Sequence, residues 1–410
     1  MTALSGVLWF LTTLYAIAYL ETSSQSRSRF FGFFSLCVSS TTGIALAGNL
    51  MTFLMFYEML TLSTYPLVVH RGTPESMRAG RTYIVYTFGG GAAFLIGVAW
   101  LKALVGSVAF TEGGMLAPYV DAYATQLRLI FFLMIAGLGV KAALVPLHGW
   151  LPQAMVAPAP VSALLHAVAV VKAGAFGIVR VVYDVYGIEF SAKLGLLQPL
   201  AAVAAFTIVY GSVRALFQDE LKKRLAFSTV SQVSYIALGA AIVGPIATIG
   251  GIVHLVHQGL MKITLFFCAG NFAETMGVHH ISQMNGVGRR MPWTMAAIAI
   301  GGLSLIGVPP TAGFVSKWYL VLGTLESGLW PIAVVVLAGS LLALMYVWKL
   351  VEAAYFGQAA DDAPVIREAP ASMLIPIWLL VAANFYFGIN TDVSVGIAQR
   401  ATAMLLGGGG

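Results

Sequence analysis

Long apolar runs follow one another along this chain almost without pause, and they constrain its fold more than any other feature. Each is about 18–25 residues long, enough for a helix to cross a hydrocarbon core of roughly 30 Å. A chain crossing that core must satisfy its own backbone hydrogen bonds, as a helix does. Because 59% of the residues are hydrophobic and only 9% are charged, the sequence predicts an all-α polytopic membrane protein.

We expect about 12 transmembrane helices, two of them broken by proline. The expected spans are residues 4–20, 30–47, 49–69, 80–105, 126–156 (broken), 160–183, 195–213, 225–243, 247–272, 293–324 (broken), 330–356 and 371–389. The more polar stretch that follows, Thr391–Leu406, is expected to form an interfacial helix.

Basic loop residues are unevenly divided if these spans alternate in direction. One face would carry Arg27, Arg29, Arg71, Arg78, Arg81, Arg214, Lys222, Lys223, Arg224, Arg289, Arg290 and Arg367. The other would carry only Lys102, Arg128, Arg180 and Lys193. The positive-inside rule makes the first face cytoplasmic, so both termini are expected on the outer, periplasmic side of a cell inner membrane.

The ten spans after the first divide into two sets of five, and the fourth member of each set is broken and bears a lysine. An odd number of spans gives the two sets opposite orientations, which is the inverted-repeat plan of many transporters. We therefore expect a first helix and loop at 1–29, inverted five-helix repeats at 30–194 and 195–357, and a C-terminal helix and tail at 358–410.

Lys141 lies in an apolar helix pattern five residues before Pro146, and Lys317 follows the second break at Gly307–Pro310. A charge at the bilayer centre costs roughly 2.5–3.5 kcal/mol on insertion scales and usually marks a functional position. Lys172 also falls near the middle of a span. Snorkelling to an interface is the structural alternative for these lysines and for Lys262.

Glu58 has about nine residues of membrane pattern on either side, so it cannot reach water easily. It is expected either to form a structural ion pair or to tune the pKa of a lysine while passing protons. His254, Gln258 and Lys262 fall at four-residue intervals on one helix face, with His257 beside them. Histidine titrates near neutral pH and suits a proton relay.

Three further positions have open roles. His166 precedes Lys172 on the near face of its span, and His148 could relay protons or cap the broken backbone. Lys349 could be functional, but an i,i+3 anchor pair with Glu352 near a cytoplasmic helix end is favoured.

The transported ion is expected to be H⁺, because a Na⁺ or K⁺ site needs several oxygen ligands and this axis is mostly lysine and histidine. Na⁺ bound elsewhere in a complex, or by backbone carbonyls near the breaks, is the alternative. Neither cysteine suggests a metal site or disulfide, and no cofactor motif appears, so redox chemistry would belong to partner subunits. Basic residues in short loops do not indicate nucleic-acid binding.

Five ordered stretches carry a resemblance to a known family. They are FYEMLTLSTYPLV around Glu58, VKAALVPLHGWLPQAMVAPAPVSALLHAVAVVKAG from Val140, DELKKRLAFSTVSQVSY at 219–235, HLVHQGLMKITLFFCAG from His254, and GVPPTAGFVSKWYL around Lys317. The chain resembles the antiporter-like proton-conducting subunits of respiratory complex I, Mrp-type Na⁺/H⁺ antiporters (their D-type member in particular) and membrane-bound hydrogenases. That family has 14 transmembrane helices with two inverted five-helix repeats.

The resemblance implies that Glu58 and Lys141 form a glutamate–lysine pair, with Lys172 as the connecting lysine. It makes His254 and Lys262 a central relay, and Lys317 the lysine of the second broken helix. Gln258 stands where the family often has a histidine. The chain starts at the family's third helix, so another polypeptide is expected to cover that flank unless the start is truncated.

The favoured function is a proton-translocating subunit that works with other membrane subunits. The complex would be an Mrp-like cation/proton antiporter or a redox-driven pump of the hydrogenase or NADH-quinone oxidoreductase type. The alternatives are a non-conducting membrane scaffold and an energising subunit for inorganic-carbon uptake. No redox or hydrolytic site is evident on the chain, so enzymatic activity would be that of a translocase subunit.

Overall fold

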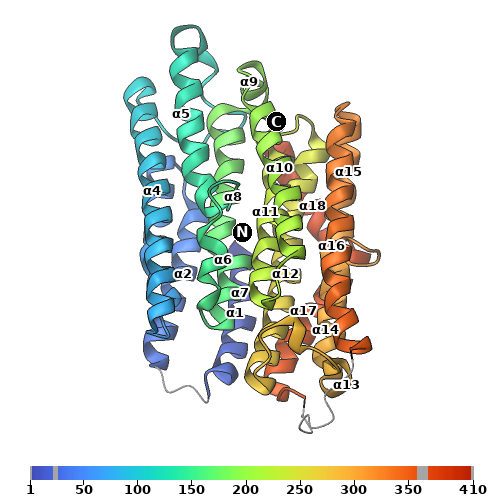
Figure 1. Ribbon diagram of the computed structural model, residues 1–410. Coiled ribbons are helices and arrows are strands. Elements are labelled where there is room, and N and C mark those ends of the chain that lie inside the picture. The colour runs from blue at the N-terminus through green and yellow to red at the C-terminus, as the bar shows by residue number, and fades with distance from the viewer. Residues whose placement is uncertain (1, 22–25, 358–367, 408–410) are drawn as a thin grey trace.

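The computed structural model describes residues 2–21, 26–357 and 368–407. Within these ranges the chain forms helices and two isolated backbone bridges, Asn49–Ala109 and Glu220–His280. Figure 1 shows the long helices standing side by side in one bundle. Nine helices of the described residues are long and apolar enough to cross a membrane, which confirms the predicted all-α polytopic class.

The helices follow the predicted spans closely. The first half contains α1 Thr2–Tyr19, α2 Arg27–Leu46, α3 Leu50–Val68, α4 Pro74–Val105, α5 Val120–Lys141, α6 Trp150–Gln153, α7 Ala159–Ala167, α8 Val170–Arg180 and α9 Ile188–Lys193. The second half contains α10 Leu197–Leu216, α11 Leu221–Ala240, α12 Pro245–Met276, α13 Val287–Arg290, α14 Pro292–Ile306, α15 Ala312–Glu326, α16 Trp330–Phe356, α17 Ala371–Ile389 and α18 Asp392–Leu405. Short turns are η1 Ala117–Tyr119, η2 Ala154–Val156, the π-helical η3 Val181–Tyr186 and η4 Ile281–Gln283.

Both predicted breaks are present. In the first, α5 ends at Lys141 and an irregular stretch leads to α6. Trp150 in α6 donates from Nε1 to the Val140 carbonyl at 2.7 Å, and the Val145 N–H donates to Thr207 Oγ1 at 3.1 Å. Thr207 therefore satisfies a backbone N–H that the helix can no longer pair, as the interior of a membrane requires. Trp150 adds a second donor to the Val140 carbonyl, which also accepts from the Ala143 N–H at 3.1 Å. In the second break, residues 307–311 separate α14 from α15.

A third break was not predicted. The span expected to be continuous over 160–183 is divided into α7 and α8 at Val168 and Ala169, whose N–H groups both donate back to Leu164. Neither proline nor glycine marks this position. The Gln258 side chain of α12 donates to the freed His166 carbonyl at 3.3 Å, so a neighbouring helix supports the break.

The stretch 159–186 and helix α12 form the centre of the bundle. Most of their side chains are buried, whereas the other apolar spans bury half of theirs or fewer. The buried helices therefore carry Lys172 and the predicted His254–Lys262 stripe.

The C-terminal stretch Thr391–Leu406, expected to be an interfacial helix, forms α18. Val395 and Ala398 are buried there beside Ile249 and Val253 of α12 and Val315 of α15. An interfacial location remains a prediction.

The two ends of the bundle differ in charge as the alternating spans predict. Figure 1 places α13 at the lower end and α9 and the C-terminus at the upper end. Arg289 and Arg290 belong to α13, and Lys193 belongs to α9. Arg367, also assigned to the basic face, lies outside the described residues. Which end faces the cytoplasm remains a prediction.

Replacement of Trp150 by phenylalanine is expected to destabilise the protein by about 0.5–1.5 kcal/mol, because the Nε1 hydrogen bond to the Val140 carbonyl is lost while the Ala143 N–H still donates to that carbonyl. Unfolding in detergent micelles measures this loss. Trp330→Phe is the matched control, because Trp330 is 66% exposed and a surface change of this kind stays within about 0.5 kcal/mol. Equal effects of the two substitutions would contradict the role of Trp150.

Candidate functional site: a buried row of basic side chains

Six basic side chains predicted to be functional are buried in the bundle. They are Lys141, Lys172, His254, His257, Lys262 and Lys317, none more than 4% exposed. They come from α5, α8, α12 and α15. Snorkelling is therefore excluded as an explanation for the lysines, because none of their side chains reaches the surface of this chain.

Lys141 contacts Tyr57 of α3 in two ways. Its Nζ donates to the Tyr57 carbonyl and lies 3.4 Å from the centroid of the Tyr57 ring. The ring face attracts the ammonium through its quadrupole. Glu58, the next residue, is half-buried, but no ion pair joins it to Lys141 among the residues that the structure describes. The implied glutamate–lysine pair therefore remains a prediction.

The Glu58 carboxylate instead lies against Gly91 of α4, where an added Cβ would collide with it. Its Oε1 is buried and finds no hydrogen-bond partner in the described chain. Gly91 thus makes room for Glu58 at the contact between α3 and α4.

Lys172 lies on α8, which packs against α5, the helix that ends at the first break. Two residues later, Gly174 packs against the end of α5, so that an added Cβ would collide with the Ala142 nitrogen and approach the Leu138 carbonyl. The Lys172 ammonium is buried and has no hydrogen-bond partner within the described ranges. The fold therefore places Lys141 and Lys172 on helices in direct contact, and Lys172 alone of the four lysines lacks a protein acceptor there.

The predicted polar stripe of α12 contacts both neighbouring helices. His254 Nδ1 lies 2.8 Å from Ser316 Oγ of α15. Lys262 donates to Ser228 Oγ and, at 3.2 Å, to the Leu225 carbonyl of α11. Gln258 lies between them and binds the α7–α8 break. Neither ring nitrogen of His257 has a partner among the described residues.

Lys317 binds the end of the helix before its own. Its Nζ donates to the Leu305 and Ile306 carbonyls at 2.8 and 3.0 Å and to Ser340 Oγ at 3.0 Å. These carbonyls terminate α14, where the helix dipole favours a cation. The second break and its lysine therefore stabilise each other.

Ser228, Gln232 and Tyr235 are site residues that the charge-based prediction missed. The Tyr235 ring centroid lies 5.3 Å from that of His254 and 5.2 Å from Lys317 Nζ. Both polar atoms of Gln232 are buried without a partner in the described chain. The sequence does hold a signal, because positions 228, 232 and 235 share one face of α11.

Three other residues predicted as possible site residues, His166, His148 and Lys349, do not belong to this row. His166 is buried, and its ring stacks on Phe266 at 4.5 Å. His148 is half-buried with its ring edge-to-face against Tyr210 at 5.0 Å. Lys349 is exposed on α16.

The expected i,i+3 anchor pair of Lys349 with Glu352 remains a prediction: both side chains are exposed, and no ion pair joins them in the described residues. Two exposed, flexible side chains gain little from being held together.

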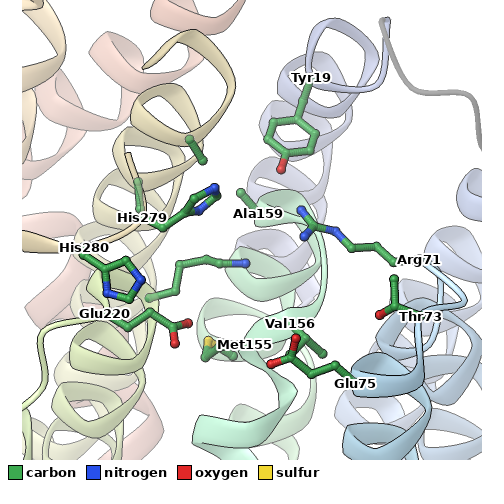
Figure 2. Close-up of a pocket in the computed structure, with 13 residues that line it drawn as sticks. Tyr19, Arg71, Thr73, Glu75, Met155, Val156, Ala159, Glu220, His279 and His280 are labelled. Atoms are coloured by element: carbon green, nitrogen blue, oxygen red, sulfur yellow. The ribbon is translucent and has the colours of Figure 1, made fainter. Parts of the chain in front are cut away.

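A cavity of about 360 Å³ lies near the end of the bundle that carries α13. Figure 2 shows Arg71, Glu75, Glu220 and His279 converging on it from separate segments. The cavity, called the inner cavity below, is lined by Tyr19, Arg71, Thr73, Glu75, Met155, Val156, Ala159, Glu220, Lys222, Ala269, Ala273, His279 and His280.

Lys222 and His279 give the inner cavity its electrostatic character. Lys222 Nζ donates to the Ala157 carbonyl at 2.7 Å. Partial burial lowers the pKa of His279, and the nearby Lys222 and Arg71 cations act in the same direction. His279 is thereby shifted toward its neutral form, and Arg71, Glu75 and Glu220 line the same cavity.

Known proteins resemble this chain in both sequence and fold. Residues 47–343 match the family model described as NADH:quinone oxidoreductase/Mrp antiporter, TM. NADH-quinone oxidoreductase subunit N of Desulforudis audaxviator (strain MP104C) is 37% identical over 405 residues, covering 95% of this chain and 80% of that protein. The D-type subunit of the Na(+)/H(+) antiporter of Bacillus subtilis (strain 168) is 28% identical over 412 residues, covering 98% of this chain and 80% of that protein.

A solved structure agrees with these sequence matches. A chain of the membrane-bound sulfane sulfur reductase, an archaeal respiratory membrane complex, superposes with a TM-score of 0.88 at 26% identity. The superposition covers 98% of this chain and 81% of that one.

Gly91→Ala is expected to slow the reaction of Glu58 with a hydrophobic carbodiimide severalfold, because the new methyl group displaces and shields the carboxylate. Mass spectrometry of the labelled peptide measures the rate. Gly89→Ala is the control on the same helix, because a Cβ there meets nothing within 4 Å. An unchanged Glu58 reactivity in Gly91→Ala would show that the carboxylate does not lie against Gly91.

Proposed function

Since this chain belongs to the NADH:quinone oxidoreductase/Mrp antiporter family of membrane proteins, we propose that it translocates protons as an antiporter-like subunit of a larger membrane complex. The relatives carrying this family's fold include a subunit of an NADH-quinone oxidoreductase and a subunit of a Na(+)/H(+) antiporter. The chain with the similar solved structure belongs to a respiratory membrane complex.

The buried row of lysines and histidines is the observation that carries this proposal. Each ionisable side chain inside a membrane protein is costly and normally has a functional reason. Four lysines and two histidines are buried here without a single ion pair to a carboxylate within the described residues. A scaffold subunit would gain nothing from them.

Protons suit this row better than metal cations. Na⁺ and related hard cations prefer several oxygen ligands, whereas Lys172, His254 and Lys262 present nitrogen atoms that gain and lose protons. Among the described residues no group of three or more histidine, cysteine or acidic side chains could hold a metal ion. If the complex exchanges Na⁺, we infer that Na⁺ crosses outside this row.

The proposed path starts at Glu58 and Lys141, continues through Lys172 to His254 and Lys262, and reaches Lys317. Buried polar atoms that find no partner among residues 2–21, 26–357 and 368–407, such as Lys172 Nζ, His254 Nε2 and the Gln232 amide, support it. Buried polar groups of this kind are commonly bridged by internal water, which conducts protons between side chains too far apart for direct transfer.

The proposed inverted repeats, 30–194 and 195–357, are supported by a matching contact in each half. Lys141, at the first break, lies over the ring of Tyr57 in the second helix of the first set. Lys317, at the second break, lies over the ring of Tyr235 in the second helix of the second set. The same kind of cation–aromatic pair thus joins the second and fourth spans of each set, although Lys141 precedes its break and Lys317 follows its own.

We place the α13 end on the cytoplasmic side of a cell inner membrane and both termini on the outer side. The excess of basic residues at that end supports this orientation. The inner cavity would then admit protons from the cytoplasm, with His166 between it and the central row. The driving reaction is proposed to be cation exchange or redox chemistry carried by partner subunits, as the names of the relatives suggest.

Lys141→Met is expected to lower proton flux through the assembled complex roughly tenfold or more, because the row loses a group that exchanges protons. Acidification of inverted membrane vesicles, followed with a pH-sensitive dye, measures the flux. Lys102→Gln is the control, since Lys102 is exposed at the far end of α4.

Complex assembly must be measured in parallel by native electrophoresis. Normal assembly with normal flux in both Lys141→Met and Lys172→Met would overturn proton translocation by this chain and favour a scaffold. Normal assembly with lost flux supports the proposal.

A further inference from the structure

A second cavity, of about 340 Å³, lies at the other end of the bundle, between α8, α12 and α18. Phe176, Val179, Arg180 and Asp184 line it from α8 and η3, and Leu255 and Met404 line it from α12 and α18. Glu112, an exposed carboxylate in the loop before α5, lines the same cavity. We propose that this outer cavity is the mouth through which Lys172 exchanges protons with the outer solution, and that Arg180 and Asp184 form its gate. This inference rests on the proposed function.

The register of α8 leads from Lys172 to the cavity. Lys172, Phe176 and Arg180 follow at four-residue intervals and therefore share one helix face. Asp184 follows Arg180 by four in η3. Because Phe176 already lines the cavity, the cavity comes within one helical turn of Lys172. The Phe176 ring is then the apolar barrier between the lysine and the outer mouth.

Arg180 and Asp184 form a close ion pair inside this mouth. Arg180 Nη1 lies 2.6 Å from Asp184 Oδ2, with the aspartate side chain 5% exposed and the arginine side chain 24% exposed. Arg180 is also held by the Ala47 carbonyl at 3.2 Å and by the Phe110 ring, whose centroid lies 4.2 Å from the guanidinium carbon. These contacts hold the Arg180 side chain in place without Asp184. Asp184 is therefore the partner that can leave the ion pair.

The backbone around Asp184 is anchored while its helix is irregular. The Asp184 and Val185 carbonyls accept from the Thr111 and Met115 N–H groups at 3.0 Å each, in the loop before α5. The surrounding turn is π-helical, a rare form that is frequent at functional sites. Opening thus requires rotation of one side chain and no movement of α8.

The proton step balances without any other reactant. The N–H bond of the Lys172 ammonium breaks, the proton moves through water past Phe176, and an O–H bond forms on the Asp184 carboxylate. The neutral carboxyl loses its electrostatic attraction to Arg180 and turns to the outer solution, where water takes the proton. The reverse sequence loads Lys172 from outside.

Asp184→Asn is expected to lower proton flux of the whole complex about tenfold and to abolish its dependence on outer pH. The amide can still accept a hydrogen bond from Arg180 but cannot carry the proton. Asp184→Glu should restore both properties. Glu189→Gln, an exposed carboxylate on α9 outside the cavity, is the control. Flux with unchanged outer-pH dependence in Asp184→Asn would overturn the gate.

Accessibility gives a second, independent measurement. A cysteine at Val179 in the assembled complex should react with a membrane-impermeant thiol reagent added from outside and remain unlabelled from inside. The two native cysteines, Cys37 and Cys268, are fully buried and give little background. Ala273→Cys, which lines the inner cavity, should show the opposite sidedness. A Val179 cysteine that is unreactive from outside would overturn the outer mouth.

The two proposals fail in different ways. If Lys141→Met and Lys172→Met leave flux normal, proton translocation itself is wrong. If those variants lose flux while Asp184→Asn keeps its outer-pH dependence and the Val179 cysteine stays unlabelled from outside, only the outer mouth is wrong.

Discussion

The structure depends on the hydrogen bonds that stabilise the buried lysine ammonium groups in the absence of bulk water. Desolvation of a charge is tolerated only when dipoles replace the lost hydration, and here the backbone supplies most of them. Lys317 takes two carbonyls from the end of α14, Lys141 takes the carbonyl of Tyr57, and Lys262 takes that of Leu225. Tyr57 and Leu225 lie inside the continuous helices α3 and α11, whereas the Leu305 and Ile306 carbonyls are free to accept because α14 ends there, so the second break supplies the acceptors of Lys317.

Much of the fold could be predicted because its signals are local. Apolar length gives the spans, and Pro146 and Pro310 give two of the breaks. The α7–α8 break escaped prediction because its cause is tertiary. Val168 and Ala169 have no unusual preference, and the freed carbonyl is satisfied by Gln258, about ninety residues later in the chain.

The charged residues of the candidate site could be predicted from the sequence, but the side chains that contact them could not. An isolated lysine in an apolar run is conspicuous, so all four buried lysines were found from the sequence. Tyr235 and Gln232 are ordinary in a helix and gain importance only because α11 packs against α12 and because the Tyr235 ring lies near Lys317 of α15. The pairing of Glu58 with Lys141 remains a prediction, and the contact of the Glu58 carboxylate with Gly91 is one that no local pattern encodes.

The arrangement of the helices that carry the row bears on which proton steps do work against the membrane potential. The helices that carry the row, α5, α8, α12 and α15, follow one another across the bundle (Figure 1). A proton step parallel to the membrane plane does little work against the transmembrane field. The work of about 2.3 kcal/mol per charge for each 100 mV therefore falls on the steps through the two cavities. The membrane potential would then control how protons enter and leave the protein. Proton transfer between the lysines would be governed by the proton affinities of those lysines.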